Sequence, residues 1–189
     1  MSTNVEIESK SMLTKDEYEK LLSNFDTAKI YKQVNYYIDS KDLILRTKKY
    51  GLRVRIKNDE FELTLKVPLE EGKLEINQQI SDNSFENLKN NNDFPNGEIK
   101  KFLEQKLNID STLLFILGNL TTYRLDLTFK SSLISIDKSE YNSVIDYEIE
   151  CEDVSLKIAK QNLKDFLSRF DIEYKKSPAT KLKRFLKTL

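Results

Sequence analysis

Apolar and polar residues alternate along much of this chain. Such alternation predicts β-strands, because successive side chains of a strand point to opposite faces of the sheet. The apolar face of each predicted strand can pack in a core, while the other face carries polar groups and charges of both signs. About eight strands are expected, at residues 5–10, 33–40, 52–57, 61–67, 73–80, 122–130, 133–138 and 145–152. Asn58 and Asp59 are expected to form the turn of a hairpin.

Three helices are expected where capping residues precede apolar residues at helical spacing. Thr14 and Glu17 have the form of a capping box for the first helix. Asp153 is expected to cap a helix that reaches about residue 170, and Ser177 with Pro178 is expected to begin the last one. The cationic residues expected on the solvated face of this last helix are Lys183, Arg184 and Lys187. Residues 81–114 lose the alternation and are expected to form loops and a helix within a single domain spanning residues 1–189.

The composition excludes several classes of function. Lysine plus arginine equals aspartate plus glutamate at 31 each, so no global basic field favours nucleic acid or an anionic membrane as partner. The chain has no histidine, which removes catalytic triads that need His and most zinc sites. Cys151 is the only cysteine and is expected to be a buried thiol of a soluble, cytoplasmic protein. No run of residues approaches the roughly 20 apolar residues that span a bilayer.

Like charges recur at a spacing of two residues, which places them on one face of a strand. Such pairs are Glu6 with Glu8, Arg53 with Arg55, and Glu148 with Glu150. Like charges on one face repel unless a group of opposite sign lies between them. Two arrangements remain open at this point: a closed barrel with its charged faces turned inward and helices outside, or an antiparallel sheet with one solvated face.

The types of charged residue limit the class of ligand that can bind. Carboxylates suit hard cations such as Mg²⁺ or Mn²⁺, and arginine and lysine suit phosphate oxygens. A site that combines both is suited to a metal-bound polyphosphate. With only four glycines and no Walker-type loop, side chains are expected to do the binding.

The ordered set of charged residues resembles the CYTH superfamily, also called the triphosphate tunnel metalloenzymes. The segment from Glu6 to Lys10 reads Glu-Ile-Glu-Ser-Lys and matches the ExExK signature of that family. Later elements follow in the family's order: Arg53 with Arg55, Lys66, Glu75, Arg124, Asp137 with Lys138, Glu148 with Glu150, and Lys181.

The resemblance implies an α+β fold: an eight-stranded antiparallel β-barrel, the triphosphate tunnel, with a charged interior and helices packed outside. It also implies hydrolysis of the terminal phosphate of inorganic triphosphate, thiamine triphosphate or a nucleoside triphosphate with Mg²⁺ or Mn²⁺. The implied metal ligands are Glu6, Glu8, Glu75, Asp137, Glu148 and Glu150. The implied substrate-binding residues are Lys10, Arg53, Arg55, Lys66, Arg124, Lys138 and Lys181. Glu6, Glu8 and Lys10 are the implied catalytic residues, with Glu6 or Glu8 orienting the attacking water.

Two other functions remain open. A class IV adenylate cyclase of the same family would bring the ribose 3′-oxygen to the α-phosphorus of ATP. A non-catalytic module would bind a polyphosphate or nucleotide without turnover.

Overall fold

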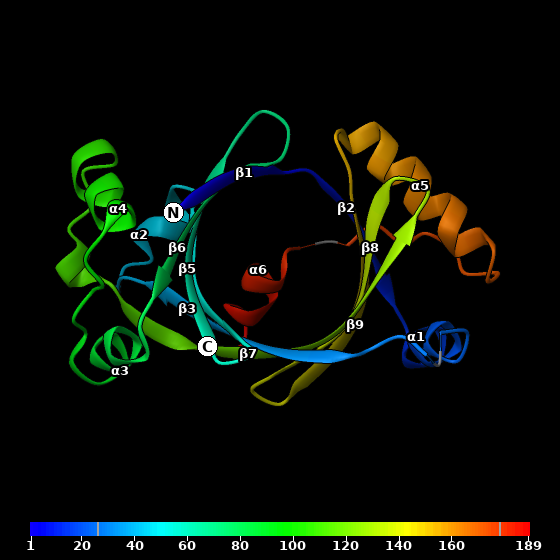
Figure 1. Cartoon of the computed structure of the whole chain (residues 1–189), viewed down its shortest axis with the longest axis horizontal. Coiled ribbons are helices and arrows are strands. Elements are labelled where there is room, and N and C mark those ends of the chain that lie inside the picture. Colours follow the sequence, from blue (N-terminus) through cyan, green and yellow to red (C-terminus); the bar gives the residue numbers. More distant parts are fainter. Residues whose placement is uncertain (26, 178) are drawn as a thin grey trace. The chain divides into compact units, whose positions relative to one another are not determined.

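The computed structural model describes residues 1–25, 27–177 and 179–189 and divides into two compact units (Figure 1). Unit 1 comprises Met1–Val5 and Gln33–Leu120, and unit 2 comprises Glu6–Lys32 and Thr121–Leu189. The expectation of one domain stays a prediction. No helix among the described residues is long and apolar enough to cross a bilayer.

Unit 1 contains an antiparallel sheet in the order β1-β6-β5-β4-β3-β7. Its strands are β1 (Ser2–Glu6), β3 (Tyr31–Asp39), β4 (Gly51–Lys57), β5 (Glu60–Pro68), β6 (Lys73–Ile80) and the first part of β7 (Phe115–Phe129). The predicted turn between β4 and β5 is confirmed: Asn58 and Asp59 have φ values of 51° and 61°. Two successive residues with positive φ are typical of the type I′ turn that matches the twist of a hairpin.

The segment between β6 and β7 forms helices and loops, as predicted. It contains α3 (Asp82–Asn91), α4 (Glu98–Lys101), the π-helical turn Phe102–Lys106 and the 3₁₀ turn Ser111–Leu113. A further short helix, α2 (Ile44–Thr47), precedes β4. Apolar residues of the strands, among them Val54, Leu63 and Leu65, share a buried cluster with Phe85 and Leu88 of α3. The apolar residues of these strands therefore face the core. The residues between them carry the charges and point to the opposite face of the sheet.

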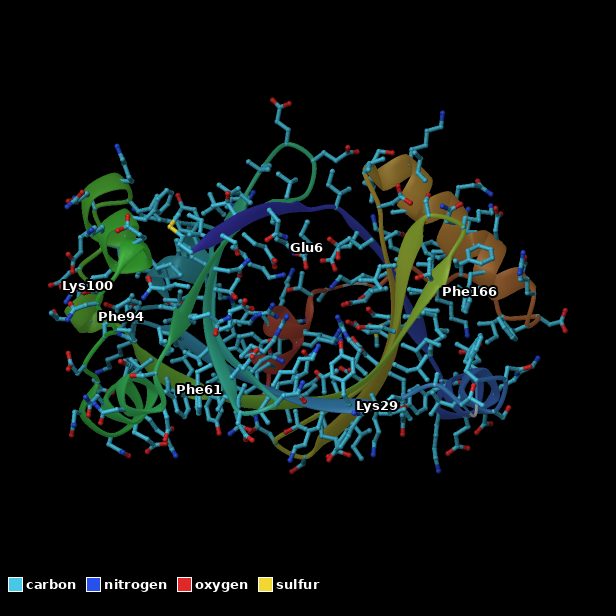
Figure 2. All side chains as sticks on the ribbon, in the orientation of Figure 1. Glu6, Lys29, Phe61, Phe94, Lys100 and Phe166 are labelled. Carbon is cyan, nitrogen blue, oxygen red and sulfur yellow. The ribbon has the colours of Figure 1, made fainter. Side chains whose placement is uncertain are left out.

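Unit 2 contains the order β7-β8-β9-β2, with β8 at Ser132–Tyr141, β9 at Val144–Glu152 and β2 at Glu8–Leu13. Helix α5 (Leu156–Ser168) packs against these strands, and α1 (Lys15–Leu22) lies against β9 and β2. Figure 2 labels Phe166 on α5, where its ring stands edge-on to Phe129 and shares the buried cluster with Ile134, Ile136 and Cys151. The last helix is α6 (Lys181–Phe185).

Several local predictions need correction. The structure describes nine strands, because Ile7 separates β1 from β2 in what the alternation predicted as one strand. Ser155, not Asp153, caps α5, since its hydroxyl accepts from the Ile158 N–H. Asp153 instead accepts hydrogen bonds from the Val154 N–H at 2.7 Å and from the Ser132 hydroxyl.

The start of the last helix is also different from the prediction. Thr180 caps α6, because its hydroxyl accepts from the Lys183 N–H at 3.2 Å. The Ser177 hydroxyl donates to the Ala179 carbonyl at 2.9 Å and does not cap the helix. Pro178, expected in the first turn, lies outside the described residues. The capping box of α1 is confirmed, with both Thr14–Glu17 hydrogen bonds present.

Candidate functional site

The register of β7, β8, β9 and β2 aligns charged side chains across the strands of unit 2. Arg124 pairs with Asp137, and Asp137 pairs with Glu148. Two residues further along β9, Glu150 pairs with Lys10 of β2. Residues opposite each other in adjacent antiparallel strands lie on the same face, so the alternation places these groups together.

Three carboxylates form the centre of this face. Asp137 and Glu148 are fully buried, and Glu150 is 8% exposed. One oxygen from each lies within 4.8 Å of one from each of the others. Buried carboxylates at this spacing are costly unless cations and hydrogen bonds compensate them. We name Asp137, Glu148 and Glu150 the carboxylate cluster.

Four cations contact the carboxylate cluster: Lys10, Arg124, Lys181 and Arg184. The Arg124 guanidinium donates to Asp137 Oδ1 and Oδ2 at 2.7 and 2.6 Å and to Glu150 Oε2 at 2.6 Å. Lys10 Nζ donates to Glu150 Oε1 at 2.6 Å and pairs with Glu8 Oε2 at 2.8 Å. Lys181 Nζ contacts all three carboxylates: Asp137 at 2.6 Å, Glu150 at 2.8 Å, and Glu148.

Glu148 and Glu150 differ in protonation behaviour although they are only two residues apart on β9. Burial acts to raise the pKa of Glu150, but Lys10, Lys181 and Arg124 outweigh it and hold that pKa well below the ordinary value. For Glu148 burial prevails over Lys181, and the pKa is raised. Two carboxylates with pKa values pushed apart by their environment are a common feature of functional sites.

Arg184 also belongs to this site, although we expected it on a solvated helix face. Its guanidinium donates to Asp146 Oδ2 at 2.7 Å and to Glu148 Oε2 at 2.6 Å. The Tyr141 hydroxyl donates to the same Asp146 carboxylate at 2.6 Å, and burial with this bond raises the pKa of Tyr141 to about 12. The sequence feature that could have identified Arg184 as a site residue is its spacing of three from Lys181, since residues three apart on a helix share a face.

Unit 1 presents a second charged group. Lys66 is paired with Glu75 across β5 and β6, and Lys66 Nζ lies 2.6 Å from Glu75 Oε1. Arg53 is paired with Thr64 one step away. Its buried Nε has no hydrogen-bond partner within the described ranges. An unpaired, buried N–H of a guanidinium is suited to donate a hydrogen bond to an anionic ligand. Arg55 lies on the same face of β4, with its Nε 3.5 Å from Asn35 Oδ1.

The charge around Glu75 predicts acid sensitivity in unit 1. Burial acts to raise its pKa, but Lys66 and Arg53 lower it from 4.5 to about 2. The folded protein therefore favours the ionised carboxylate, and the stabilisation is present above about pH 4.5 and lost as the pH falls towards about 2. We expect Glu75→Gln to flatten the pH dependence of the free energy of unfolding in this interval, measured by urea denaturation. The exposed control Glu71→Gln should follow the wild type, and an unchanged pH dependence in Glu75→Gln would contradict this assignment.

One predicted site residue, Lys138, lies away from the carboxylate cluster. Lys138 is on the opposite face of β8 from Asp137, where Nζ pairs with Glu140 at 2.6 Å and lies 5.5 Å from the Tyr123 ring centroid. The structure does not bring Lys138 to the carboxylate cluster. Glu6 is the last residue of β1 (Figure 2), and Ile7 separates it from Glu8, the first residue of β2.

The carboxylate cluster fits a divalent cation. Its donors are all carboxylate oxygens, the ligands that Mg²⁺ and Mn²⁺ prefer. They come from two adjacent paired strands, whose register is set by a continuous ladder. Lys181 Nζ already lies among these oxygens, so the cluster accommodates a positive charge.

Comparison with known proteins places the chain in a family. The CYTH domain family model matches residues 4–186. A relative from Bacillus subtilis (strain 168), named "Putative triphosphatase YjbK", is 36% identical over 187 residues, which cover 98% of this chain and 96% of the relative.

Two solved structures share the fold. One from Bacillus halodurans, described as "a putative adenylate cyclase", has a TM-score of 0.89 at 30% identity and covers 98% of this chain and 99% of its own. A Hippeastrum protein, described as "Putative adenylyl cyclase HpAC1" that "reveals a dominant triphophatase activity", has a TM-score of 0.81 at 22% identity, with 97% and 96% covered. These likenesses confirm the predicted fold class, an α+β antiparallel barrel type with helices outside. The chain belongs to the CYTH domain family.

Proposed function

We propose that this protein is a metal-dependent triphosphatase that releases the terminal phosphate of inorganic triphosphate, thiamine triphosphate or a nucleoside triphosphate. The observation that carries the proposal is the carboxylate cluster, three buried acids enclosed by Lys10, Arg124 and Lys181. The name of the Bacillus subtilis relative, a triphosphatase, supports the same reaction.

The residues divide into two roles. Asp137, Glu148 and Glu150 would hold Mg²⁺ or Mn²⁺, which when bound supplies Lewis-acid polarisation of phosphate oxygens. Lys10 and Arg124 balance the charge of the carboxylates and offer N–H donors to phosphate. Glu8 of β2, which contacts Lys10 at 2.8 Å, would orient the attacking water molecule. The catalytic role of Glu6 rests on the ExExK resemblance. The metal role of Glu75 rests on its place in the ordered family motifs and on its low pKa.

In unit 1, Arg53, Arg55 and Lys66 are assigned to phosphate binding. We expect Arg53→Ala to raise the KM for triphosphate by about 10- to 100-fold and to change kcat little, because lost binding common to ground and transition states appears in KM. Steady-state kinetics at saturating metal would measure this effect. Arg46→Ala, which removes an exposed arginine of α2 in the same unit, is the matched control. A loss confined to kcat would remove Arg53 from substrate binding.

A substrate panel tests the function directly. Phosphate release would be followed with tripolyphosphate, thiamine triphosphate and ATP, each with Mg²⁺, with Mn²⁺ and with chelator. We expect at least one of these triphosphates to be hydrolysed, and we expect its hydrolysis to require the metal. Triphosphate binding without turnover under every metal condition would identify a non-catalytic binding module.

The adenylate cyclase alternative is supported by the description of the Bacillus halodurans structure. It is distinguished by the products formed from ATP. Cyclic AMP and pyrophosphate would indicate a cyclase, whereas ADP and phosphate would indicate the proposed triphosphatase. Ion-exchange chromatography of a single reaction separates cyclic AMP from ADP.

A further inference from the structure

Lys181 occupies the position that the proposed function gives to a divalent cation. Its ammonium contacts Asp137 Oδ2 at 2.6 Å and Glu150 Oε1 at 2.8 Å, and it also contacts Glu148 Oε1. These contacts involve all three members of the carboxylate cluster. The side chain is only 12% exposed, so the ion pairs are shielded from water and strongly coupled.

An ammonium and a divalent cation cannot share these oxygens. The carboxylate oxygens lie within 4.8 Å of one another, and a metal bonded to them would lie within a few ångströms of Lys181 Nζ. Two cations at that separation repel strongly in a buried site. Metal binding to the cluster therefore requires that Lys181 leaves it.

Lys181 can leave while α6 stays in place, because other contacts hold the helix. Arg184, one turn along, is bound to Asp146 and to the second oxygen of Glu148. Phe185 is fully buried and packs edge-on against Tyr141. A lysine has a flexible four-carbon stem, and its ammonium can move without its backbone. Arg124 differs, since its planar fork is fixed by two bonds to Asp137.

We propose that Lys181 is an exchangeable internal counter-ion of the metal site: it neutralises the carboxylate cluster before metal binds, and the incoming divalent cation displaces it. This inference rests on the proposed function, which assigns the cluster to metal. The displaced ammonium is then available to a phosphate oxygen of the substrate. Binding of metal and binding of triphosphate are thereby coupled, and the coupling is reciprocal.

The first test measures metal binding without substrate. Mn²⁺ is titrated into wild-type protein, Lys181→Met and Lys183→Met, and free Mn²⁺ is quantified by electron paramagnetic resonance. Methionine keeps an unbranched side chain one heavy atom shorter than lysine and removes the competing charge. We expect Lys181→Met to lower the Kd for Mn²⁺ by about tenfold, within the roughly 5- to 150-fold range of coupled sites. Lys183 is an exposed lysine of the same helix, and its variant should match the wild type.

The outcomes separate this inference from the proposed function. Equal or weaker Mn²⁺ binding by a folded Lys181→Met, with clear binding by the wild type, would overturn the inference and leave the metal site intact. Absence of Mn²⁺ binding in both proteins would overturn the metal site and the inference with it. A wild-type Kd that Glu148→Gln does not change would place the metal elsewhere and would also overturn the inference.

A second measurement uses only the wild-type protein and covers the case in which Lys181→Met does not fold. Amine acetylation is followed residue by residue by mass spectrometry, with and without saturating Mg²⁺. We expect Lys181 to be protected without metal and its acetylation rate to rise several-fold with Mg²⁺, in the range of such couplings. Lys183 is the internal reference and should not change. Equal protection of Lys181 in both conditions, at a Mg²⁺ concentration shown to saturate the site, would overturn the inference.

Discussion

Glu148→Gln is expected to abolish metal-dependent triphosphate hydrolysis while leaving a folded protein. Glutamine keeps the size of the side chain and one oxygen that can accept from either Lys181 or Arg184, but it removes the negative charge that a divalent cation needs. Changes to residues that only support a metal ligand cost about 10- to 100-fold in metal affinity or activity, so loss of a direct ligand should exceed about 100-fold. Phosphate release at saturating Mg²⁺ or Mn²⁺ measures the effect.

Glu140→Gln is the matched control for this substitution. Glu140 lies on neighbouring β8 and pairs with Lys138 at 2.6 Å, away from the carboxylate cluster. Its substitution should leave turnover unchanged, and circular dichroism should show that both variants are folded. Wild-type activity in Glu148→Gln would remove Glu148 from the metal site.

Arg124→Met is expected to give the largest loss of stability. The substitution leaves Asp137 and Glu150 with two fewer and one fewer donated hydrogen bonds, respectively. Asp137 is fully buried and keeps Lys181 as a cationic partner, so the loss should approach but not exceed the roughly 3–5 kcal/mol that follows when a buried charge loses its partner. Urea denaturation followed by circular dichroism measures the change in the free energy of unfolding.

A double-mutant cycle identifies the cause of that loss. In Arg124→Met/Asp137→Asn the buried charge is removed with its partner, and we expect the double variant to be more stable than Arg124→Met alone. Arg124→Lys keeps the charge but not the planar fork and should lie between the wild type and Arg124→Met. A loss below about 1 kcal/mol in Arg124→Met, the value of an exposed pair, would show that solvent screens these charges.

The local elements were predictable because they depend on neighbouring residues. Alternation identified the strands from Gly51 to Ile80 and the pairs Glu8–Lys10 and Glu148–Glu150, since a spacing of two is enough to place residues on one face. The capping box at Thr14 and the turn at Asn58 follow from equally short patterns. The errors at Asp153 and Ser177 arose where two capping residues lie close together in the sequence, and the path of the chain selects between them.

The roles of two cations of α6 needed the fold. Lys183 and Arg184 are adjacent in the sequence, but Lys183 is exposed while Arg184 contacts Asp146 and Glu148 of β9. The difference follows from how α6 is rotated about its own axis relative to the strands of unit 2, which no local pattern specifies. Lys138 is the converse case, because a local rule is enough to place it. It follows Asp137 directly in β8, so the alternation of the strand puts it on the other face, beside Tyr123.

The sequence by itself determined which residues alternate, which charges recur at a spacing of two, and which family the ordered motifs resemble, because these properties lie in the order of residues along the chain. Only the tertiary structure decided that Asp137, Glu148 and Glu150 come within 4.8 Å of one another and that the ammonium of Lys181 lies among them. Such contacts join residues up to 44 positions apart. They depend on strand register and on the docking of the last helix, and those are set by the packing of the core as a whole.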